Sequence, residues 1–488
     1  MHSILKTPSA LMRRSNRKPR RTNVRWPGFL LAALLGAPVA MLAQSAEEQE
    51  QMARMLANRH AKRICSGVFL SGREAGAVVT QDHDTPTSLV DVQVNRVAGT
   101  VAVSSMGGEG MAVYRPGLGC TIAVDLSPDQ LAAQANGVPL PKPLDSEVPF
   151  PLGSKVEIAT PAGVDRAKLD AALDKAFSEP NPDLRRGSRG AIVVYDGEVV
   201  GERYAEGFGP DKPLIIWSMS KSLTSAWIGL LARDGKLDPM GPAPVPEWAT
   251  EGDPRGAITI DQLLRMSSGL KFQEVYEAGL IDVAVMLFGE SDMAHFAAAQ
   301  PLEAEPDGKW SYSSGTTNIL ARIAKDALGG EIAPALSYLR SELLDRIGMH
   351  QTVLELDESG TAVGSSYGYS TPRDMARFGL LYLQKGLWNG ERVLPEEWVE
   401  YSVTPTPLAP RQQYGAQFWL NAGDPDDPTK RRFPSVPTDA FWLSGFEGQS
   451  VVVVPSRKAV IVRLGRTIGD GAFDLDEFLA DVLSALPE

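Results

Sequence analysis

Two β-hairpin patterns, far apart in the chain, most restrict the fold that these 488 residues can adopt. In the first, AIVVY at 191–195 and EVVGE at 198–202 flank an Asp-Gly pair, which is typical of two-residue hairpin turns. In the second, SVVVV at 450–454 and AVIVRL at 459–464 flank a four-residue turn. The sequence between the two hairpins has mainly helical patterns. We therefore expect an α+β fold in which both chain ends build one antiparallel sheet around an inserted helical lobe.

Helical spacing is clearest after Trp217. Apolar side chains recur at the helical period from Met219 to Leu230, so residues 218–234 are predicted to form a helix with this stripe in the core. Thr371 and Pro372 are typical of an N-cap and a first helical position. The predicted helices of this region are 164–177, 218–234, 261–266, 371–384, 395–401 and a last one over 473–483.

A proline-rich segment divides the chain. Five prolines fall within thirteen residues (Pro139, Pro141, Pro143, Pro149 and Pro151), a density that excludes regular structure and indicates a stiff linker over 139–155. Residues 46–138 are predicted to be an N-terminal extension, with a polar helix at 47–63 and short strands within 66–125. Residues 156–488 are predicted to form the catalytic domain.

The first 45 residues resemble an export signal. Residues 1–26 contain eight Lys or Arg and no acid, residues 27–43 are uncharged and apolar, and small residues follow before an acidic stretch. As a helix, the apolar run would span about 25 Å, which is less than the roughly 30 Å of a bilayer core. A cleaved signal peptide is the main prediction, and an uncleaved inner-membrane anchor is the alternative. The mature body is expected in the periplasm or outside the cell, with no other membrane contact.

The charge and the cysteines limit the partners. Without the eight basic residues of the head, 40 basic residues (48 less 8) face 60 acidic ones, a net charge of −20 that disfavours nucleic-acid binding. Cys65 and Cys120 are the only cysteines. The sequence contains neither a CxxC nor an HExxH motif, so no metal site is predicted. In an oxidising compartment they are candidates for a disulfide, the alternative being two buried thiols. Nothing in the sequence indicates the oligomeric state.

The first candidate for chemistry is the SxxK pattern at Ser218 and Lys221. On a helix these residues are i and i+3, so their side chains lie on the same face. A serine hydroxyl needs a group that takes its proton, and a lysine can do so when burial lowers its pKa. The backbone N–H of Ser218, near the start of the predicted helix, is a candidate donor to an oxyanion. SxxK alone also fits an ordinary helix start with its lysine in solvent.

Two further motifs follow in the sequence. Tyr312, in the polar string WSYSSG at 310–315, is a candidate for proton transfer to a leaving group. The string SGFEGQ at 444–449 enters the second hairpin, and its glycines allow a close backbone approach to a substrate. Gly448 and the N–H of Gln449 are therefore candidates for the side of the oxyanion site opposite Ser218. Each motif alone also fits an ordinary structural role.

Together, in this order and spacing, the motifs resemble those of the penicillin-recognising serine hydrolases, a family related to class C β-lactamases. The similarity is strongest to the 6-aminohexanoate-dimer hydrolase group and covers about 160–485. It extends to the strings LLRMSSGL at 263–270, TPRDMARFG at 371–379, LPEEW at 394–398 and YGAQFW at 414–419. The resemblance implies a β-lactamase/transpeptidase-like fold. It also implies Ser218 as the nucleophile, Lys221 as its base and Tyr312 in proton transfer at the leaving group, with a small-molecule amide or ester as substrate and no cofactor.

Two positions depart from the family pattern. Ser314 stands where β-lactamases have the Asn of Tyr-x-Asn, and Phe446 is expected in the place of the Lys or His before x-Gly. That cation normally holds a substrate carboxylate, so its loss disfavours β-lactams and favours linear amides or esters. Ser314, Phe446 and Tyr276, the last in a segment at 272–276 expected over the pocket, are candidate substrate contacts.

Other functions are weighed against this one. A carboxylesterase, a weak β-lactamase and a non-catalytic ligand- or cell-wall-binding module share the same expected fold. GSSYG at 364–368 matches the GxSxG nucleophile elbow, but a polar turn precedes it and no histidine follows His350. The sequence therefore disfavours an α/β-hydrolase.

Overall fold

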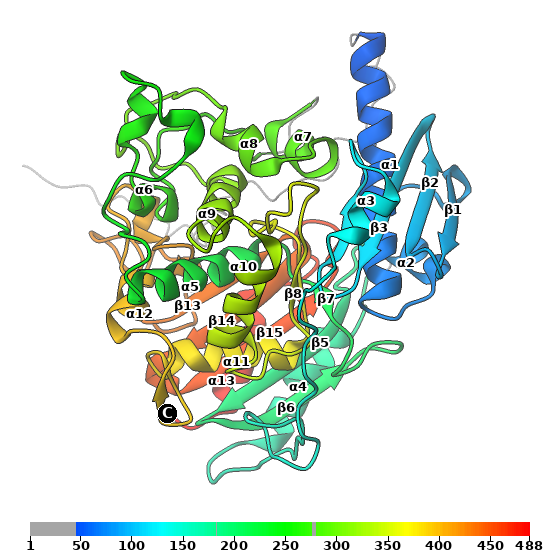
Figure 1. Cartoon of the computed structure of the whole chain (residues 1–488). Coiled ribbons are helices and arrows are strands. Elements are labelled where there is room, and N and C mark those ends of the chain that lie inside the picture. Colours follow the sequence, from blue (N-terminus) through cyan, green and yellow to red (C-terminus); the bar gives the residue numbers. More distant parts are fainter. Residues whose placement is uncertain (1–44, 182, 276–279) are drawn as a thin grey trace, which may run out of the picture.

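The computed structural model describes residues 45–488 except 182 and 276–279. The predicted export signal, apart from Ser45, lies outside the described residues. At the centre is a six-stranded antiparallel sheet in the order β12-β13-β14-β15-β5-β6 (Figure 1). Its strands are β5 (Ser188–Tyr195), β6 (Glu198–Tyr204), β12 (Trp419–Leu420), β13 (Phe441–Gly445), β14 (Gln449–Val454) and β15 (Ala459–Gly465). β15 pairs with β5, Val462 opposite Ile192, which confirms the predicted sheet built from both ends.

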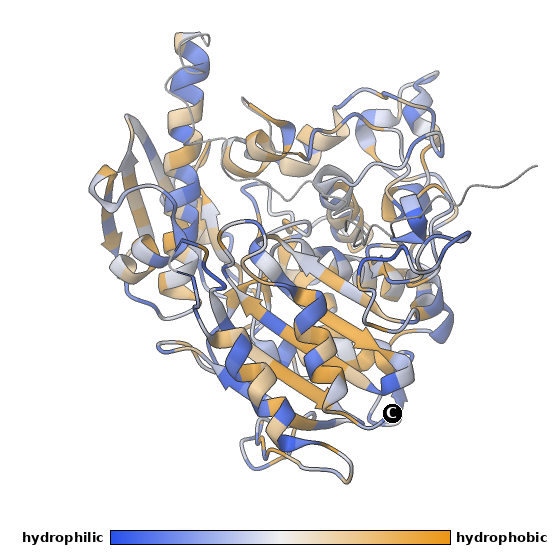
Figure 2. Ribbon diagram, turned by 180° about the vertical axis from the view of Figure 1, so that it is seen from behind, coloured by the Kyte–Doolittle hydropathy of each residue, from blue (hydrophilic) through white to orange (hydrophobic). Residues whose placement is uncertain are grey.

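The sheet is apolar on both faces because helices cover both. Ala191 and Val193 of β5 face α4 (Arg166–Phe177) and α13 (Leu475–Ser484), the two helices that cross the orange sheet in Figure 2. The alternate residues, Ile192 and Val194, belong to a larger core on the opposite face. That core includes α5 (Ser220–Arg233), α9 (Ser314–Asp326) and α11 (Pro372–Leu383). Strands covered on both sides have near-continuous apolar runs, as these do.

The segment between the two hairpins supplies the helical lobe. Its other helices are α6 (Ile260–Leu264), α7 (Asp282–Gly289), α8 (Met293–Ala298), α10 (Ile332–Leu339) and α12 (Glu396–Ser402). Small sheets join β7 (Leu214–Ile215), β9 (Gly368–Ser370) and β8 (Val353–Leu354), and β10 (Leu387–Trp388) with β11 (Glu391–Arg392). Thr371 caps α11 through its side chain, with Pro372 in the first turn, as predicted from the sequence.

The N-terminal extension is a small unit beside this domain. Helix α1 (Ala46–Phe69) packs across a four-stranded antiparallel sheet and lies next to the catalytic domain (Figure 1). The other elements are α2 (Ala75–Asp82), β1 (Val90–Asn95), β2 (Thr100–Ser105), β3 (Gly108–Arg115), β4 (Gly119–Ile122) and α3 (Pro128–Ala133). The predicted helix at 47–63 ends too early. The last turns of α1 are buried, polar residues included, so tertiary contacts extend the helix beyond its sequence pattern.

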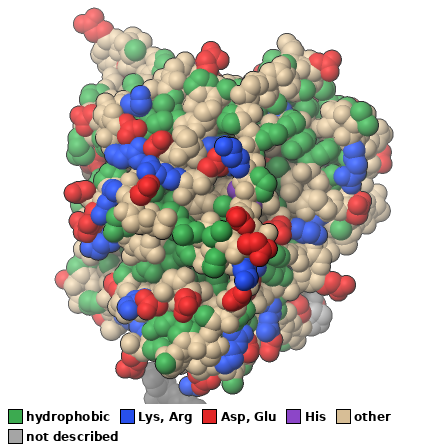
Figure 3. Space-filling model, turned by 60° about the horizontal axis from the view of Figure 1, so that its bottom comes forward, with side chains coloured by type: hydrophobic (Ala, Val, Ile, Leu, Met, Phe, Trp, Pro, Cys, Tyr) green, Lys and Arg blue, Asp and Glu red, His purple; other side chains and the backbone are tan. Residues whose placement is uncertain are grey.

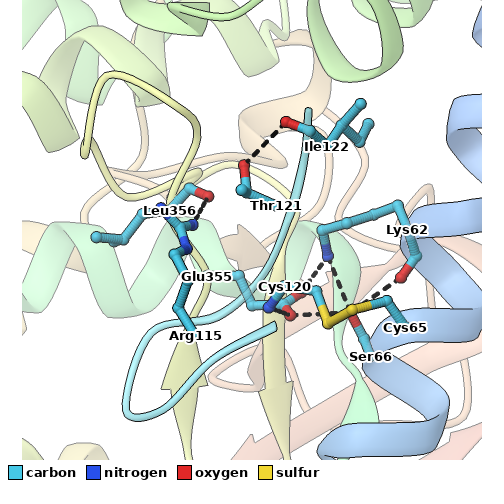
Figure 4. The surroundings of a disulfide bond; sticks show 9 residues. All are labelled: Lys62, Cys65, Ser66, Arg115, Cys120, Thr121, Ile122, Glu355 and Leu356. Atoms are coloured by element: carbon cyan, nitrogen blue, oxygen red, sulfur yellow. Dashed lines mark hydrogen bonds and ion pairs between the residues drawn. A yellow bond between two sulfur atoms is a disulfide. The ribbon is translucent and has the colours of Figure 1, made fainter. Parts of the chain in front are cut away.

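A buried polar cluster joins the extension to the catalytic domain (Figure 4). Cys65 of α1 and Cys120 of β4 form a disulfide with their Cα atoms 6.1 Å apart. Next to it, the carboxylate of Glu355 pairs with Lys62 and accepts a 2.8 Å hydrogen bond from Ser66 and a 2.6 Å bond from the backbone N–H of Cys120. Several donors thus satisfy the hydrogen-bonding capacity of this buried carboxylate.

Replacing both cysteines is expected to destabilise the folded protein. The disulfide spans 55 positions of sequence, and on the chain-entropy model a loop of that size contributes about 4 kcal/mol. Denaturant unfolding of Cys65→Ala/Cys120→Ala, compared with the oxidised wild type, measures the difference. Wild type treated with a reductant should match the double variant, and an unchanged midpoint in both would contradict the prediction.

The predicted linker is held against the catalytic domain. No helix or strand lies within 139–155, and the side chain of Arg377 in α11 donates to the carbonyl oxygens of Pro151 and Gly153 at 2.8 and 2.7 Å.

Acidic and basic side chains are interspersed over the face shown in Figure 3. Among the described residues, no helix has the length and apolar character needed to span a bilayer.

Candidate active site

Ser218 lies in a 3₁₀ turn, Trp217–Met219, that leads into α5. Helix α5 thus begins two residues later than the sequence predicts. Trp217 has a left-handed φ of 48°, so the chain turns sharply before the serine. Met219 is fully buried, which anchors the turn in the core, while Ser218 itself is half-buried. The nucleophile candidate is therefore held on a rigid element and remains accessible.

Lys221 is buried below Ser218. The ammonium Nζ donates to Ser218 Oγ at 3.2 Å, to Ser314 Oγ at 3.0 Å and to the carbonyl of Ser365 at 3.0 Å. Burial lowers the pKa of Lys221 to about 8, against the opposing effect of the Glu274 carboxylate. About one-tenth of the amine is then neutral at pH 7, and this form can accept a proton from Ser218.

Tyr312 reaches the same hydroxyl from the loop before α9. Its phenol hydrogen-bonds Ser218, and its ring centre lies 4.9 Å from Lys221 Nζ. The ring stacks on Trp419 and meets Tyr414 edge-on, with centres 5.4 and 5.8 Å apart. Burial raises the pKa of Tyr312 well above its ordinary value, so the phenol keeps its proton and can donate it.

Ser314 and Glu274 complete this network. Ser314 Oγ donates to Glu274 Oε1 at 2.7 Å, and its backbone N–H donates to Oε2 at 2.8 Å. Ser314 thus links Lys221 to a carboxylate, which differs from the substrate contact expected from the sequence. Glu274 was missed because no spacing rule connects it to a residue 40 positions later. It lies in the segment expected over the pocket, whose last residue, Tyr276, is outside the described residues.

Replacing Glu274 with Gln is expected to move the acidic limb of the pH profile of kcat/KM to lower pH. The carboxylate favours the charged form of Lys221, so removing it lowers the pKa of the lysine below the wild-type value of about 8 and leaves more neutral amine at a given pH. The profile with a p-nitrophenyl ester measures the shift. Glu303→Gln, in an exposed ion pair of the same lobe, is the control, and a shift to higher pH in Glu274→Gln would contradict the assignment.

In the glycine turn at 444–449, Gly445 and not Gly448 lies against the turn that carries Ser218. A Cβ on Gly445 would lie 2.3 Å from the carbonyl oxygen of Ile216, so Gly445 makes the close approach to the turn that carries Ser218. Gly448 instead faces Arg463 and Thr467, and the side-chain amide of Gln449 bonds Gly465 of β15.

The residue before x-Gly in the glycine turn is then Leu443, not Phe446. Leu443 is fully buried and Phe446 packs edge-on against Trp217, with ring centres 5.7 Å apart. Both assignments leave an apolar residue where the family has a cation. Two x-Gly pairs, Ser444-Gly445 and Glu447-Gly448, fit the third family motif, so the sequence pattern alone does not decide between Leu443 and Phe446.

The GxSxG string does not supply a nucleophile. The side chain of its central Ser366 is buried and lies 2.9 Å from that of Ser365. Gly368 packs under the Ser218 turn, where its N–H donates to Ser220 Oγ at 2.9 Å. The string therefore supports α5 and contributes the Ser365 carbonyl to Lys221. Within the described part of the chain, no three His, Cys, Asp or Glu side chains gather as metal ligands would.

A serine that contacts a buried lysine of lowered pKa and a neutral tyrosine, between an antiparallel sheet and a helical lobe, defines a serine hydrolase of the Ser-x-x-Lys class. Residues 173–483 match the family model described as Beta-lactamase, and the chain belongs to that family. The match lies within the predicted catalytic domain, 156–488, and leaves the N-terminal extension outside.

Individual relatives agree with this family. The 6-aminohexanoate-dimer hydrolase of Paenarthrobacter ureafaciens is 26% identical over 303 residues, which are 56% of this chain and 71% of that protein. A Bacillus anthracis protein with a provisional assignment as 6-aminohexanoate-dimer hydrolase shares the fold, with a TM-score of 0.54, 23% identity and coverage of 72% of this chain and 91% of that one. A family VIII carboxylesterase gives a TM-score of 0.51 at 15% identity, covering 68% and 98%.

Proposed function

We propose that this protein cleaves linear amide or ester bonds through an acyl-enzyme on Ser218. The observation that carries the proposal is the buried Lys221 Nζ within 3.2 Å of Ser218 Oγ, with the Tyr312 hydroxyl on the same oxygen. A lysine of ordinary pKa in solvent would not serve as a base. Burial lowers the pKa of Lys221 to about 8, so this lysine can.

In the acylation step, neutral Lys221 takes the hydroxyl proton while Ser218 Oγ attacks the carbonyl carbon. The backbone N–H of Ser218 donates to the oxygen that becomes negative. When the tetrahedral intermediate collapses, Tyr312 gives its proton to the departing amine or alcohol, and Lys221 restores the proton of the tyrosine. Water then attacks the ester on Ser218, with the same groups acting in reverse, and releases the acid.

The pocket wall favours substrates without a carboxylate at the third motif. Leu443 stands where a cation would otherwise bind that group, so a β-lactam or D-Ala-D-Ala peptide loses about 1.5–3 kcal/mol of charge-assisted binding. Trp310 and Trp419, which are partly exposed, pack with Tyr312 and offer an aromatic surface to an extended aliphatic chain. A relative named for hydrolysis of a 6-aminohexanoate dimer supports this substrate class.

A substrate panel tests the proposal. Short linear amide oligomers, short-chain p-nitrophenyl esters and a chromogenic cephalosporin are each given to wild type and to Ser218→Ala. We expect Ser218-dependent turnover of an amide or ester, with the cephalosporin at least about tenfold poorer, as the lost carboxylate contact implies. Turnover of the cephalosporin above both other classes would overturn the substrate assignment.

We also propose that the protein is exported. The basic and apolar head of the sequence and a disulfide, which persists in oxidising compartments, support this location. Cell fractionation followed by mass determination of the N-terminus separates a cleaved signal, near residue 45, from an anchored full-length chain. Protein found only in the cytoplasm with its first residues intact would contradict the proposal.

A further inference from the structure

The N-terminal extension contacts the glycine turn next to Ser218. Arg63 of α1 forms two parallel hydrogen bonds to the carboxylate of Glu447, at 3.1 and 2.9 Å. These side chains are only 4% and 5% exposed. A guanidinium that grips a carboxylate with both nitrogens fixes its orientation as well as its position. Arg63 precedes the region matched by the family model by more than a hundred residues.

The same carboxylate also holds the residue before the nucleophile. The indole Nε1 of Trp217 donates to Glu447 Oε2 at 3.2 Å, and the guanidinium of Arg63 lies 5.6 Å from the centre of the Trp217 ring. Arg466, just after β15, donates to Glu447 Oε1 at 3.1 Å. Burial opposes the charge of Glu447, but Arg63 and Arg466 lower its pKa, so it stays ionised. One carboxylate thus joins α1, the end of the sheet and the Ser218 turn.

Two of the joined residues have unusual backbones. Trp217 has φ 48° and Glu447 has φ 62°, both in the left-handed region that non-glycine residues seldom adopt. Such conformations persist where the surroundings hold them. Trp217 directly precedes Ser218, so its backbone sets the direction in which the Ser218 hydroxyl points.

We propose that Arg63 and Glu447 are positioning residues, through which the N-terminal extension holds Trp217 in its left-handed conformation and so presents Ser218 to Lys221. The inference rests on the proposed function of Ser218. On this proposal, the extension contributes to catalysis through Glu447 and Trp217, not through contact with the substrate.

Two double variants with matched changes test the proposal. Arg63→Met/Glu447→Met removes the ion pair at the Ser218 turn. Lys62→Met/Glu355→Met removes the neighbouring buried ion pair, which also joins α1 to the catalytic domain but does not contact that turn. Each variant is compared with wild type for unfolding midpoint, kcat and KM with the best ester of the panel, and activity is expressed per folded molecule.

We expect kcat of Arg63→Met/Glu447→Met to fall about ten- to hundredfold, the effect of losing a charged hydrogen bond that orients the nucleophile. KM should change much less, and the Lys62/Glu355 variant should keep kcat within about twofold of wild type, since the bonds of this pair go to Ser66 and Cys120 and not to the Ser218 turn. Equal kcat values in the two double variants would overturn the proposal, because the extension would then act through stability alone.

Trp217→Phe keeps an aromatic ring at this position but removes the five-membered ring of the indole together with its N–H, and it leaves both ion pairs intact. It therefore decides the question if a double variant does not fold. Its kcat should fall in the same direction, and a wild-type kcat would overturn the proposal. Ser218→Ala separates this inference from the proposed function: if wild-type turnover equals that of Ser218→Ala, the proposed function fails and the positioning role fails with it. If turnover depends on Ser218 but not on Trp217 or Arg63, only the positioning role fails.

Discussion

Ser218→Ala is expected to lose esterase and amidase turnover by about 10⁴-fold or more, since covalent catalysis has no other route in this site. The hydroxyl is the atom on which Lys221 and Tyr312 converge, and its removal leaves both without a substrate-attacking group. The fold should be retained, because the half-buried Oγ fills little core volume. Steady-state kinetics and intact mass after treatment with a fluorophosphonate measure the effect.

The matched control for Ser218→Ala is Ser366→Ala, the serine of the GxSxG string. It should keep turnover close to wild type and still gain the mass of one phosphonate group, because its side chain is buried and bonds the Ser365 hydroxyl, not Ser218. Equal labelling of wild type and Ser218→Ala would show that the reactive serine lies elsewhere.

Replacement of Lys221 should have the next largest effect. Lys221→Ala removes the proton acceptor of Ser218, and general-base catalysis typically contributes about 10²–10⁴-fold. Near its pKa of about 8, the buried amine is partly neutral at physiological pH, and the fraction able to accept a proton grows as the pH rises. The wild-type profile of kcat/KM should therefore rise through this region, and that limb should be absent in the variant.

Lys221→Arg distinguishes the base from a mere positive charge. A guanidinium keeps the charge but does not give up its proton in proteins, so this variant should be as impaired as Lys221→Ala. Retention of more than a tenth of wild-type kcat by Lys221→Arg would assign the base to another group. Circular dichroism and unfolding midpoints of both variants separate loss of chemistry from loss of fold.

The central sheet and the main site residues could be predicted from the sequence because the patterns that indicate them are local. A hairpin dipeptide, apolar alternation and SxxK spacing all act over a few residues, and the structure places Ser218, Lys221 and Tyr312 together. Glu274 and Arg63 were missed because they reach their partners across 40 and 384 positions. Gly448 was chosen over Gly445 because a motif of one fixed residue fits at two registers, and only packing against Ile216 decides between them.

The pairing of β5 with β15 has a consequence for how the chain must fold. Val193 lies opposite Ile461, so the central contact of the sheet closes across more than half of the chain. Contacts of such long range carry a large loop-closure cost and slow the rate-limiting step of folding. During synthesis the helical lobe is complete well before β13–β15 emerge, and until then β5 has an open edge. The catalytic domain is therefore a unit that cannot be shortened from its C-terminus: removal of β15 and α13 would leave the sheet without its central strand.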